Sequence, residues 1–444
     1  MTHVNNFEYS RIAEIQSQIR HLTAEYHDLT KDRATRHRRP EFKMPAGACF
    51  DDRDRTEAVM AALDLELTGG RSVVEFERGL SEKIKMRSSI ACNSGSSANL
   101  LAFATLCDPS LDNHIKKGAE VITSAVEFPT TVAPILQYGC VPVVVDVEPQ
   151  IGNLNLDALE EAVSSRTQAI MSAHTLGSPF RADHVREFAD LNNLWFIEDN
   201  CDSLGATVAE RPAGSFGHLS TLSFYPAHHI TSGEGGCVSA QSVQTATIVR
   251  SLRDWGRDCW CSPGEDNRCM SRFDWRLPGL PDGFDHKYVF TRVGFNLKMS
   301  DLQARVLMSQ LQKVDTFTER RNRNWEILYS YLHDCRGVIL FTNAEGTRPS
   351  WFGFTFMLTN HSKLSRRQLQ IALEQSGIGS RVVFAGNITA QPMFRGRQMR
   401  IIGDLPVANR IARDALWVGV YPGLSEEDMH YMGCRIRSLI TEGN

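Results

Sequence analysis

The sequence predicts an α/β protein in which a large domain with a mostly parallel sheet is followed by a smaller C-terminal α+β domain. Between about residues 50 and 310, short runs of β-branched and aliphatic side chains alternate with segments of helical periodicity. Strands that alternate with helices at this spacing form a sheet that is covered on both faces. The chain has 444 residues, of which 42% are hydrophobic, and this length allows two or three compact domains.

Residues 1–50 are expected to form an amphipathic helix and a basic linker. Apolar side chains recur there at steps of three and four residues, the spacing of one helix face: Ile12, Ile15, Ile19, Leu22, Tyr26 and Leu29. We expect this stripe to pack on the body of the protein or on a second subunit. Because the basic segment 31–39 follows it, an arm that binds nucleic acid is the alternative.

The large domain is expected to span residues 51–310. Its predicted strands are residues 121–123, 141–147, 169–171 and 195–197, and helical patterns cover residues 156–163 and 185–191. Reactive or aromatic side chains follow the apolar runs, where parallel sheets bind ligands: Glu127, Phe128, His174, Asp199, Ser223 and His228. A long helical stretch, 299–333, leads into the small domain, 311–444, which includes an aromatic strand at 351–356.

Composition and charge exclude several classes of protein. The formal net charge is −4, from 48 basic and 52 acidic side chains, so we expect neither a nucleic-acid partner nor a membrane partner. No apolar run reaches the ~20 residues of a membrane-spanning helix, and the N-terminus lacks the basic start and apolar core of a signal peptide. We therefore expect a soluble, cytoplasmic protein.

Eleven cysteines are many for a cytoplasmic chain, and disulfides are not expected in that compartment. Seven lie among small or apolar neighbours and are interpreted as buried thiols: Cys49, Cys92, Cys107, Cys140, Cys237, Cys335 and Cys434. Cys259, Cys261 and Cys269 differ, because they crowd into one segment rich in proline, glycine and charge. This segment, 256–290, is interpreted as an insertion in the large domain.

Several residues suit a phosphorylated pyridine cofactor. Residues 93–99 form a small-residue turn before an apolar helix, and backbone N–H groups and hydroxyls at Gly95 and Ser96 suit a phosphate, with Ser223 as a further contact. A purely structural turn is the alternative. Asp199 ends an apolar strand, where its carboxylate could keep a pyridine nitrogen protonated, or else form a salt bridge or helix cap. Phe128 could stack on the ring, although a core position is usual for phenylalanine.

The segment 223–236, which reads SFYPAHHITSGEGG, carries the most specific signal. Together with residues 93–97, Glu198, Asp199 and residues 294–304, it resembles the sugar-modifying branch of fold-type-I pyridoxal-phosphate (PLP) enzymes in order and spacing. The resemblance extends from about residue 45 to the C-terminus. These enzymes are aminotransferases and dehydratases of nucleotide-linked 4-keto-6-deoxy sugars. The resemblance implies an aspartate-aminotransferase-like fold.

His228 marks a departure from the aminotransferases of this family, which have at that position the lysine that binds PLP covalently. Imidazole has no primary amine, but it accepts and donates protons near neutral pH. The exchange of lysine for histidine resembles the 3-dehydrases of 3,6-dideoxysugar synthesis. It implies that pyridoxamine phosphate (PMP) is held noncovalently and that His228 is the catalytic base.

The cysteines resemble the ligand set of the iron–sulfur-containing 3-dehydrases. Cys201 would join Cys259, Cys261 and Cys269 around a [2Fe–2S] cluster, although structural zinc accepts four thiolates equally well. The resemblance then implies a flavin/iron–sulfur reductase as electron donor and deoxygenation at C-3 of a nucleotide-diphospho-4-keto-6-deoxyhexose. It favours CDP as the nucleotide, with dTDP and GDP as alternatives.

Other positions are carried over from the same family. His174 is expected to line the pocket in a supporting role, and Asp202 to lie near the ring hydroxyl of the cofactor. Asn296 matches a residue that reaches the cofactor phosphate of the neighbouring subunit, which implies a homodimer. His229 is expected to point away from the cofactor, because adjacent residues point apart.

Three other functions stay open. A sugar aminotransferase of the same fold would need a lysine at position 228. A redox-neutral dehydratase, which uses glutamate in place of an electron donor, would share His228 but would not need four clustered cysteines. A metal-binding regulatory or scaffold protein could reuse the fold, but the phosphate turn, Asp199 and His228 together argue against it.

Overall fold

The computed structural model describes residues 6–36, 42–65, 67–261 and 265–443. At its centre lies an eight-stranded sheet with the order β1-β9-β8-β5-β4-β2-β3-β14. Neighbouring strands are parallel, except that β9 is antiparallel to both β1 and β8. The strands are β1 (Ser88–Cys92), β2 (Glu120–Ser124), β3 (Val141–Val145), β4 (Thr167–Ala173), β5 (Trp195–Asp199), β8 (Leu219–Ser223), β9 (Gly236–Ala240) and β14 (Arg400–Ile401). The predicted mostly parallel sheet is confirmed, and each predicted strand of the large domain overlaps an observed one.

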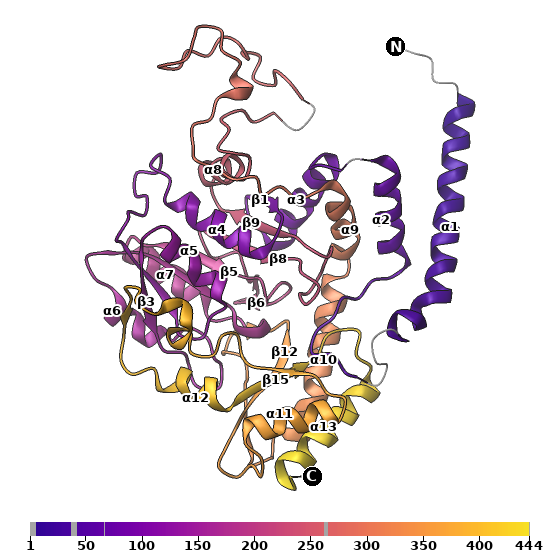
Figure 1. Cartoon of the computed structure of the whole chain (residues 1–444), viewed down its shortest axis with the longest axis vertical. Helices are drawn as coiled ribbons and strands as arrows, with labels where there is room; N and C mark the ends of the chain where they lie inside the picture. The colour runs from indigo at the N-terminus through magenta and orange to yellow at the C-terminus, as the bar shows by residue number, and fades with distance from the viewer. Residues whose placement is uncertain (1–5, 37–41, 66, 262–264, 444) are drawn as a thin grey trace.

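Helices cover both faces of this sheet (Figure 1). Val121 of β2 packs in one core cluster with Phe103, whereas the next residue, Ile122, packs in another cluster with Val185. Successive side chains of a strand point to opposite faces, so both faces need a helical cover. The helices are α2 (Asp52–Asp64), α3 (Arg71–Ile84), α4 (Gly95–Leu106), α5 (Pro129–Gln137), α6 (Leu159–Ala162), α7 (Ala182–Leu191), α8 (Val243–Arg253) and α9 (Asp301–Leu311).

The C-terminal part of the chain packs around a four-stranded antiparallel sheet of order β10-β12-β15-β13. The aromatic strand predicted at 351–356 is β12, and β14 returns to the edge of the large sheet. Three short strands form a further sheet, β11-β6-β7. The bounds are α10 (Val314–Leu332), β10 (Val338–Leu340), β12 (Gly353–Leu358), α11 (Arg366–Gln375), β13 (Ser380–Arg381), α12 (Pro406–Asp414), β15 (Ala415–Gly419), α13 (Glu426–Thr441), β6 (Thr207–Val208), β7 (Arg211–Pro212) and β11 (Thr347–Arg348).

The single helical stretch expected at 299–333 is two helices, α9 and α10. The break falls at Gln312 and Lys313, and the ammonium group of Lys313 lies 2.6 Å from Asp51 and 2.7 Å from Asp54. These two ion pairs hold the break between α9 and α10 next to the start of α2. Nowhere in the described ranges is a helix long and apolar enough to cross a membrane.

The predicted N-terminal helix is confirmed as α1 (Asn6–Arg36), which lies alongside α2 (Figure 1). Arg20 forms an ion pair of 3.4 Å with Glu57, and the guanidinium of Arg55 lies 6.0 Å from the centre of the Tyr26 ring. Most of the apolar stripe is nevertheless exposed. Residues 37–41 of the predicted basic linker lie outside the described residues.

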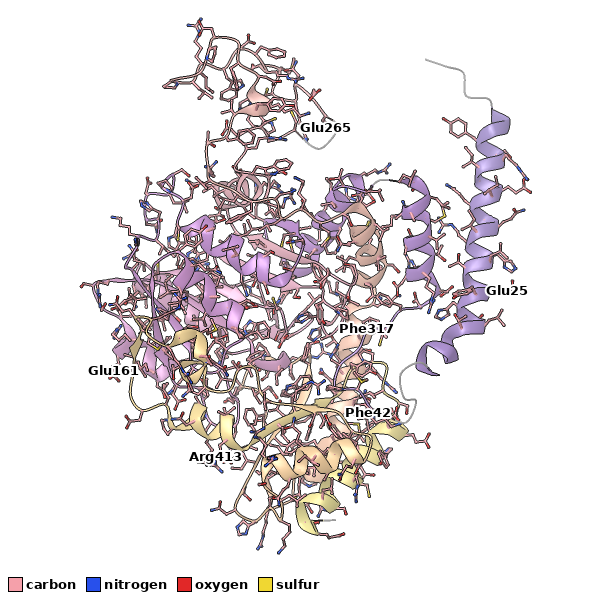
Figure 2. The ribbon with its side chains drawn as sticks, viewed as in Figure 1. Glu25, Phe42, Glu161, Glu265, Phe317 and Arg413 are labelled. Carbon is pink, nitrogen blue, oxygen red and sulfur yellow. The ribbon has the colours of Figure 1, made fainter. Side chains whose placement is uncertain are left out.

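The predicted insertion extends away from the body between α8 and α9 (Figures 1 and 2). We call residues 257–261 and 265–293 the cysteine arm. Its two ends are held together, because the N–H of Trp255 donates to the carbonyl of Phe295 at 2.5 Å and the N–H of Thr291 donates to Gly256 at 2.9 Å. Gly256 is needed at this root: its φ is +80°, and a Cβ would lie 1.9 Å from the carbonyl oxygen of Arg292.

Candidate active site

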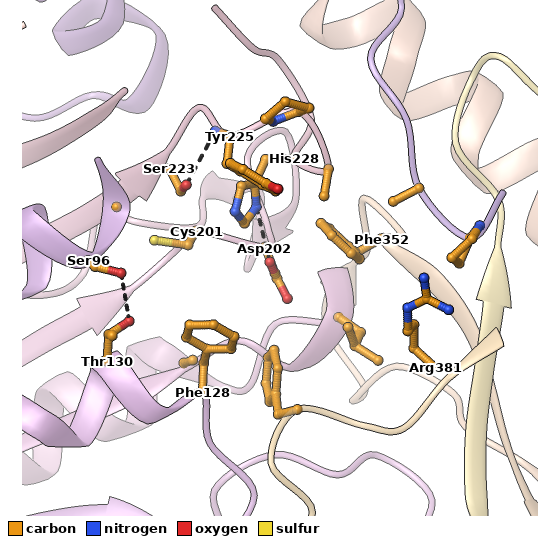
Figure 3. Close-up of a pocket in the computed structure, with 18 of the residues that line it drawn as sticks. Ser96, Phe128, Thr130, Cys201, Asp202, Ser223, Tyr225, His228, Phe352 and Arg381 are labelled. Carbon is orange, nitrogen blue, oxygen red and sulfur yellow. Dashed lines mark hydrogen bonds and ion pairs between the residues drawn. The ribbon is translucent and has the colours of Figure 1, made fainter. Parts of the chain in front are cut away.

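A cavity of about 1110 Å³ opens at the carboxyl ends of β4, β5 and β8 (Figure 3). The structure brings together eight of the predicted site residues in its wall: Gly95, Ser96, Phe128, Asp199, Cys201, Asp202, Ser223 and His228. They come from segments far apart in the sequence. The other predicted site residues, His174, Asn296 and the three cysteines of the arm, do not line this cavity.

The predicted phosphate turn forms the start of α4. The hydroxyl of Ser94 caps the helix by accepting a hydrogen bond from the N–H of Ser97 at 3.1 Å. A Cβ on Gly95 would lie 2.4 Å from the Cβ of Ser223, so only glycine lets the helix approach β8 this closely. Because the first N–H groups of a helix have no partner within it, this end of the cavity suits a phosphate.

Asp199 is buried at the end of β5, where one carboxylate oxygen receives two side-chain hydrogen bonds. The amide of Asn99 and the hydroxyl of Thr131 each donate to its Oδ2 at 2.8 Å, and the N–H of Cys201 donates to its Oδ1 at 3.1 Å. These donors hold the carboxylate at the cavity wall. A carboxylate fixed in this way can bind a protonated ring nitrogen.

A second buried carboxylate, Glu127, lies behind Asp199 and does not line the cavity. Burial and the nearby charge of Asp199 raise the pKa of Glu127 to about 8, against hydrogen bonds from Ser172, Ala173 and Ser124. At neutral pH this group is therefore mostly protonated. Of these two carboxyl groups, Asp199 is the one that faces the cavity.

His174 does not line the cavity, which corrects the prediction that it does. Ala173 lines the cavity instead, and His174 is fully buried with its Nε2 2.8 Å from Glu198. Burial alone would raise the pKa of Glu198, but hydrogen bonds from His174, Gly214 and Gly217 hold it below the usual value. The His174–Glu198 pair therefore lies behind Ala173 and Asp199, the cavity-lining residues at the ends of β4 and β5.

His228 faces the cavity from the loop after β8 (Figure 3). Its Nδ1 lies 3.2 Å from a carboxylate oxygen of Asp202, and its carbonyl oxygen accepts a hydrogen bond from Arg321 at 3.3 Å. His229 is buried and points away, with Nε2 2.7 Å from the carbonyl of Ser350, and burial holds its pKa well below the usual value. His228 is thus the histidine that can exchange protons with a bound molecule.

Aromatic side chains and one arginine form a further part of the wall (Figure 3). Phe128 is half exposed, and its ring centre lies 6.3 Å from that of Phe384 in an edge-on arrangement. Phe352 lies 5.5 Å from the ring of His228. Arg381 adds a positive charge on the far side of the cavity. Together they form an apolar slot for a flat ring and a cationic end for a phosphate-bearing ligand.

The four cysteines do not meet within one chain. Cys201 lies in the cavity, where Asp199, Asp202 and Thr221 are its electrostatic and hydrogen-bonding neighbours. Cys259 interacts instead with Cys261 and Cys269 on the arm. Within the described part of the chain, no group of three or more Cys, His, Asp or Glu side chains is arranged to hold a metal ion. The expectation that the arm folds back over Asp199 is wrong for the isolated chain.

Asn296 lies at the root of the arm, where its backbone forms a bridge with Asp254. Its side chain is exposed and is not part of its own chain's cavity. Its assignment to the partner's phosphate site stays a prediction.

Sequence reasoning missed several residues that shape the site. Asn99 lies one helical turn after the phosphate turn, so its position on α4 could have suggested the contact with Asp199. Thr131, Arg321 and Arg381 carry no comparable signal. Only the folded chain brings Thr131 to Asp199, Arg321 to the carbonyl of His228 and Arg381 to the cavity wall.

Comparisons with known proteins show the family to which the chain belongs. Residues 50–437 match the DegT/DnrJ/EryC1/StrS aminotransferase family. The chain is 47% identical over 401 residues to the dTDP-4-dehydro-2,6-dideoxy-D-glucose 3-dehydratase of Saccharopolyspora spinosa, covering 90% of this chain and 87% of the relative. It is 44% identical to the lipopolysaccharide biosynthesis protein RfbH of Salmonella typhimurium, covering 87% and 89%.

The solved structure of the E. coli GDP-4-keto-6-deoxy-D-mannose-3-dehydratase with bound hydrated PLP has the same fold. It superposes with a TM-score of 0.79 at 26% identity, covering 90% of this chain and 99% of that one. The predicted aspartate-aminotransferase-like fold is confirmed. The chain belongs to the DegT/DnrJ/EryC1/StrS aminotransferase family of PLP enzymes.

Proposed function

We propose that the chain is a PMP-dependent 3-dehydratase that acts on a nucleotide-diphospho-4-keto-6-deoxyhexose. One observation carries this proposal: His228 lies beside Asp202 in the cavity, and among the described residues that line it there is no lysine. Without a lysine amine, the chain cannot hold the cofactor covalently as the family's aminotransferases do. The amine that meets the ketone must then come from the cofactor itself. The relatives named as sugar 3-dehydratases support the same reaction class.

The residues of the cavity fit PMP. The start of α4 and Ser223 would bind its phosphate, Asp199 would face its ring nitrogen, and Phe128 would lie against its ring. Bound there, PMP supplies an amine that condenses with a ketone and a ring that accepts electrons. His228 would take a proton from the carbon that carries the amine and give a proton to the departing 3-hydroxyl. Asp202 would keep the imidazole oriented.

We further propose that the four cysteines serve a [2Fe–2S] cluster, in an enzyme that is a cytoplasmic homodimer with Asn296 at the partner's phosphate site. The contact of the N–H of Cys261 with the sulfur of Cys259 at 3.5 Å and the place of Cys201 next to Asp199 support this. Net deoxygenation replaces a C–OH bond by a C–H bond, consumes two electrons and two protons, and releases water. A flavin/iron–sulfur reductase would be the electron donor.

A redox-neutral 3-dehydratase is the second candidate, because Cys201 and the arm do not meet within one chain. It would use the same cavity and the same base, with glutamate in place of the reductase. A sugar aminotransferase is disfavoured by His228 in place of lysine.

We propose that the substrate is a nucleotide-linked sugar, without assigning one particular nucleotide. The resemblance favours CDP, but the relative at 47% identity is named for a dTDP sugar and the solved neighbour for a GDP sugar, so the preference for CDP is not supported. All three nucleotides therefore belong in the substrate test.

The absence of a covalent link is directly testable. Protein loaded with PLP and treated with borohydride should release its cofactor on gel filtration under denaturing conditions, because His228 has no amine to be reduced onto the ring. An aminotransferase of the family, treated in parallel, should keep its cofactor. A reduced pyridoxyl-lysine peptide from this chain, found by mass spectrometry, would contradict the proposal.

A further inference from the structure

Arg321 is a buried charged side chain to which the proposed reaction assigns no part. It lies on α10, and only 1% of its surface is exposed. We propose that Arg321 is a positioning residue, whose guanidinium holds the backbone of His228 so that the imidazole faces the cavity. This inference rests on the proposed role of His228 as the base, and it adds the residue that fixes the base in place.

The guanidinium of Arg321 joins two segments that are far apart in the sequence. It donates hydrogen bonds to the carbonyl of His228 at 3.3 Å, to that of Trp351 at 3.2 Å and to that of Phe352 at 3.4 Å. The first carbonyl belongs to the loop after β8, whereas the other two directly precede β12 of the four-stranded sheet. The planar fork of a guanidinium carries five donors, so it can bind several carbonyls at once. One side chain therefore links the loop of the base to the start of β12.

The charge of Arg321 is not neutralised by direct contact with a carboxylate. In the part of the chain that the structure describes, its hydrogen-bond partners are carbonyl groups, and its Nε has no partner. Burial lowers the pKa of Arg321 to about 10, against the electrostatic effects of Cys49 and Asp202, so the group stays positive at neutral pH. A buried cation without a paired carboxylate is unfavourable for folding unless its hydrogen bonds compensate. Stability alone is therefore a weak reason for a guanidinium at this place.

Two of the three carbonyls belong to residues whose rings line the cavity. The rings of His228 and Phe352 lie 5.5 Å apart in its wall (Figure 3), and the guanidinium carbon lies 5.9 Å from the centre of the Phe352 ring. Asp202, which faces Nδ1 of His228 at 3.2 Å, is also one of the acidic groups that act on the charge of Arg321. Arg321 itself does not line the cavity, so it acts on the base through these contacts.

Other hydrogen bonds hold the same part of the structure together without Arg321. Nε2 of His229 lies 2.7 Å from the carbonyl of Ser350, and the side-chain amide of Asn322 donates to the carbonyl of Pro349 at 2.8 Å. These contacts remain when Arg321 is replaced, so we expect its variants to fold. What a variant loses is the specific hold on the carbonyl of the base.

Arg321→Met tests this role, because methionine fills similar space without donors, and apolar replacement of buried charged groups is often tolerated. Proton exchange at the amine-bearing carbon of PMP should fall by about 10²-fold, the loss typical of a small misplacement of a reacting group. PMP affinity should change little, because the phosphate turn and Asp199 are untouched. Arg321→Lys keeps the charge but not the planar fork, so its exchange rate should lie between those of Arg321→Met and wild type.

Asn322→Ala is the matched control on the same helix. It removes the neighbouring bond to Pro349 without touching His228, so it should lower the melting temperature yet leave the exchange rate within a few-fold of wild type. In Arg321→Ala, added guanidinium, at concentrations that leave wild type folded, should restore part of the exchange, whereas uncharged urea should not. Wild-type exchange in Arg321→Met and Arg321→Lys, or an equal loss in Asn322→Ala, would overturn the positioning role.

A second readout needs no cofactor. In protein labelled with ¹³C-histidine, the ring signals of His228 are identified by their loss in His228→Asn. They should form one narrow set in wild type and in Asn322→Ala, but split or broaden in Arg321→Met and Arg321→Lys. One unchanged set in both Arg321 variants would overturn the inference. Wild-type protein that exchanges no proton with PMP would instead contradict the proposed function, and the ring signals would still show whether Arg321 holds His228.

Discussion

Replacement of His228 by asparagine is expected to slow proton exchange at the amine-bearing carbon of PMP by about 10²–10⁴-fold, the usual contribution of a positioned base. The reason is geometric: His228 faces the cavity beside Asp202, whereas His229 is turned toward Ser350. Exchange can be followed by NMR as deuterium enters bound PMP from heavy water. PMP affinity, measured in parallel, should change little.

His229→Asn is the neighbouring control for this experiment. It should leave the exchange rate within a few-fold of wild type, even if it lowers the melting temperature by removing the contact with Ser350. If His228→Asn kept wild-type exchange, or if His229→Asn were the variant that lost it, the base would be assigned to the wrong residue.

Replacement of Asp199 by asparagine is expected to lower the exchange rate and the dehydration rate by about 10²–10³-fold, the effect typical of losing one fixed electrostatic contact to a developing charge. The carboxylate is held by Asn99 and Thr131, so it is ready to keep a ring nitrogen protonated. In the variant, the absorption of bound PMP should titrate with the ring nitrogen at a lower pH than in wild type.

Glu127→Gln is the matched control for Asp199. Glu127 is a buried carboxyl group close to Asp199 but outside the cavity, and burial raises its pKa to about 8. An uncharged amide resembles its neutral form, so activity at neutral pH should stay close to wild type. Equal losses in the two variants would show that Asp199 acts through the fold, without contact to the cofactor.

Much of the site could be predicted because the residues of each motif lie close together in the sequence. The turn at Gly95 and the strand that ends in Asp199 can each be recognised from a few consecutive residues. The carboxyl ends of parallel strands lie at one edge of the sheet, so the residues that follow them lie close together. The prediction that His174 lines the cavity was wrong because successive residues along a strand point to opposite faces of the sheet. Ala173 shares the cavity face with Asp199, so the next residue, like Glu198, lies on the opposite face.

The direction of the cysteine arm could not be predicted from the sequence. The spacing of Cys259, Cys261 and Cys269 indicates one group of thiols, but among the described residues no three such side chains are arranged to hold a metal ion. The direction of the arm depends on contacts between residues far apart in the sequence, such as Trp255 with Phe295. The distance from the arm to Cys201 follows from that direction, so it could not be judged from cysteine spacing alone.

The central claim, C-3 dehydration with PMP, is tested most directly by oxygen exchange. Wild-type enzyme with PMP and no reductant is incubated in ¹⁸O-water with the dTDP, CDP and GDP forms of the 4-keto-6-deoxyhexose, and the recovered sugars are analysed by mass spectrometry. Reversible loss of the 3-hydroxyl should place ¹⁸O at C-3 of at least one of them, with no amino sugar formed. Formation of a 4-amino sugar with accumulation of PLP, or recovery of all three sugars without label at C-3, would contradict the account.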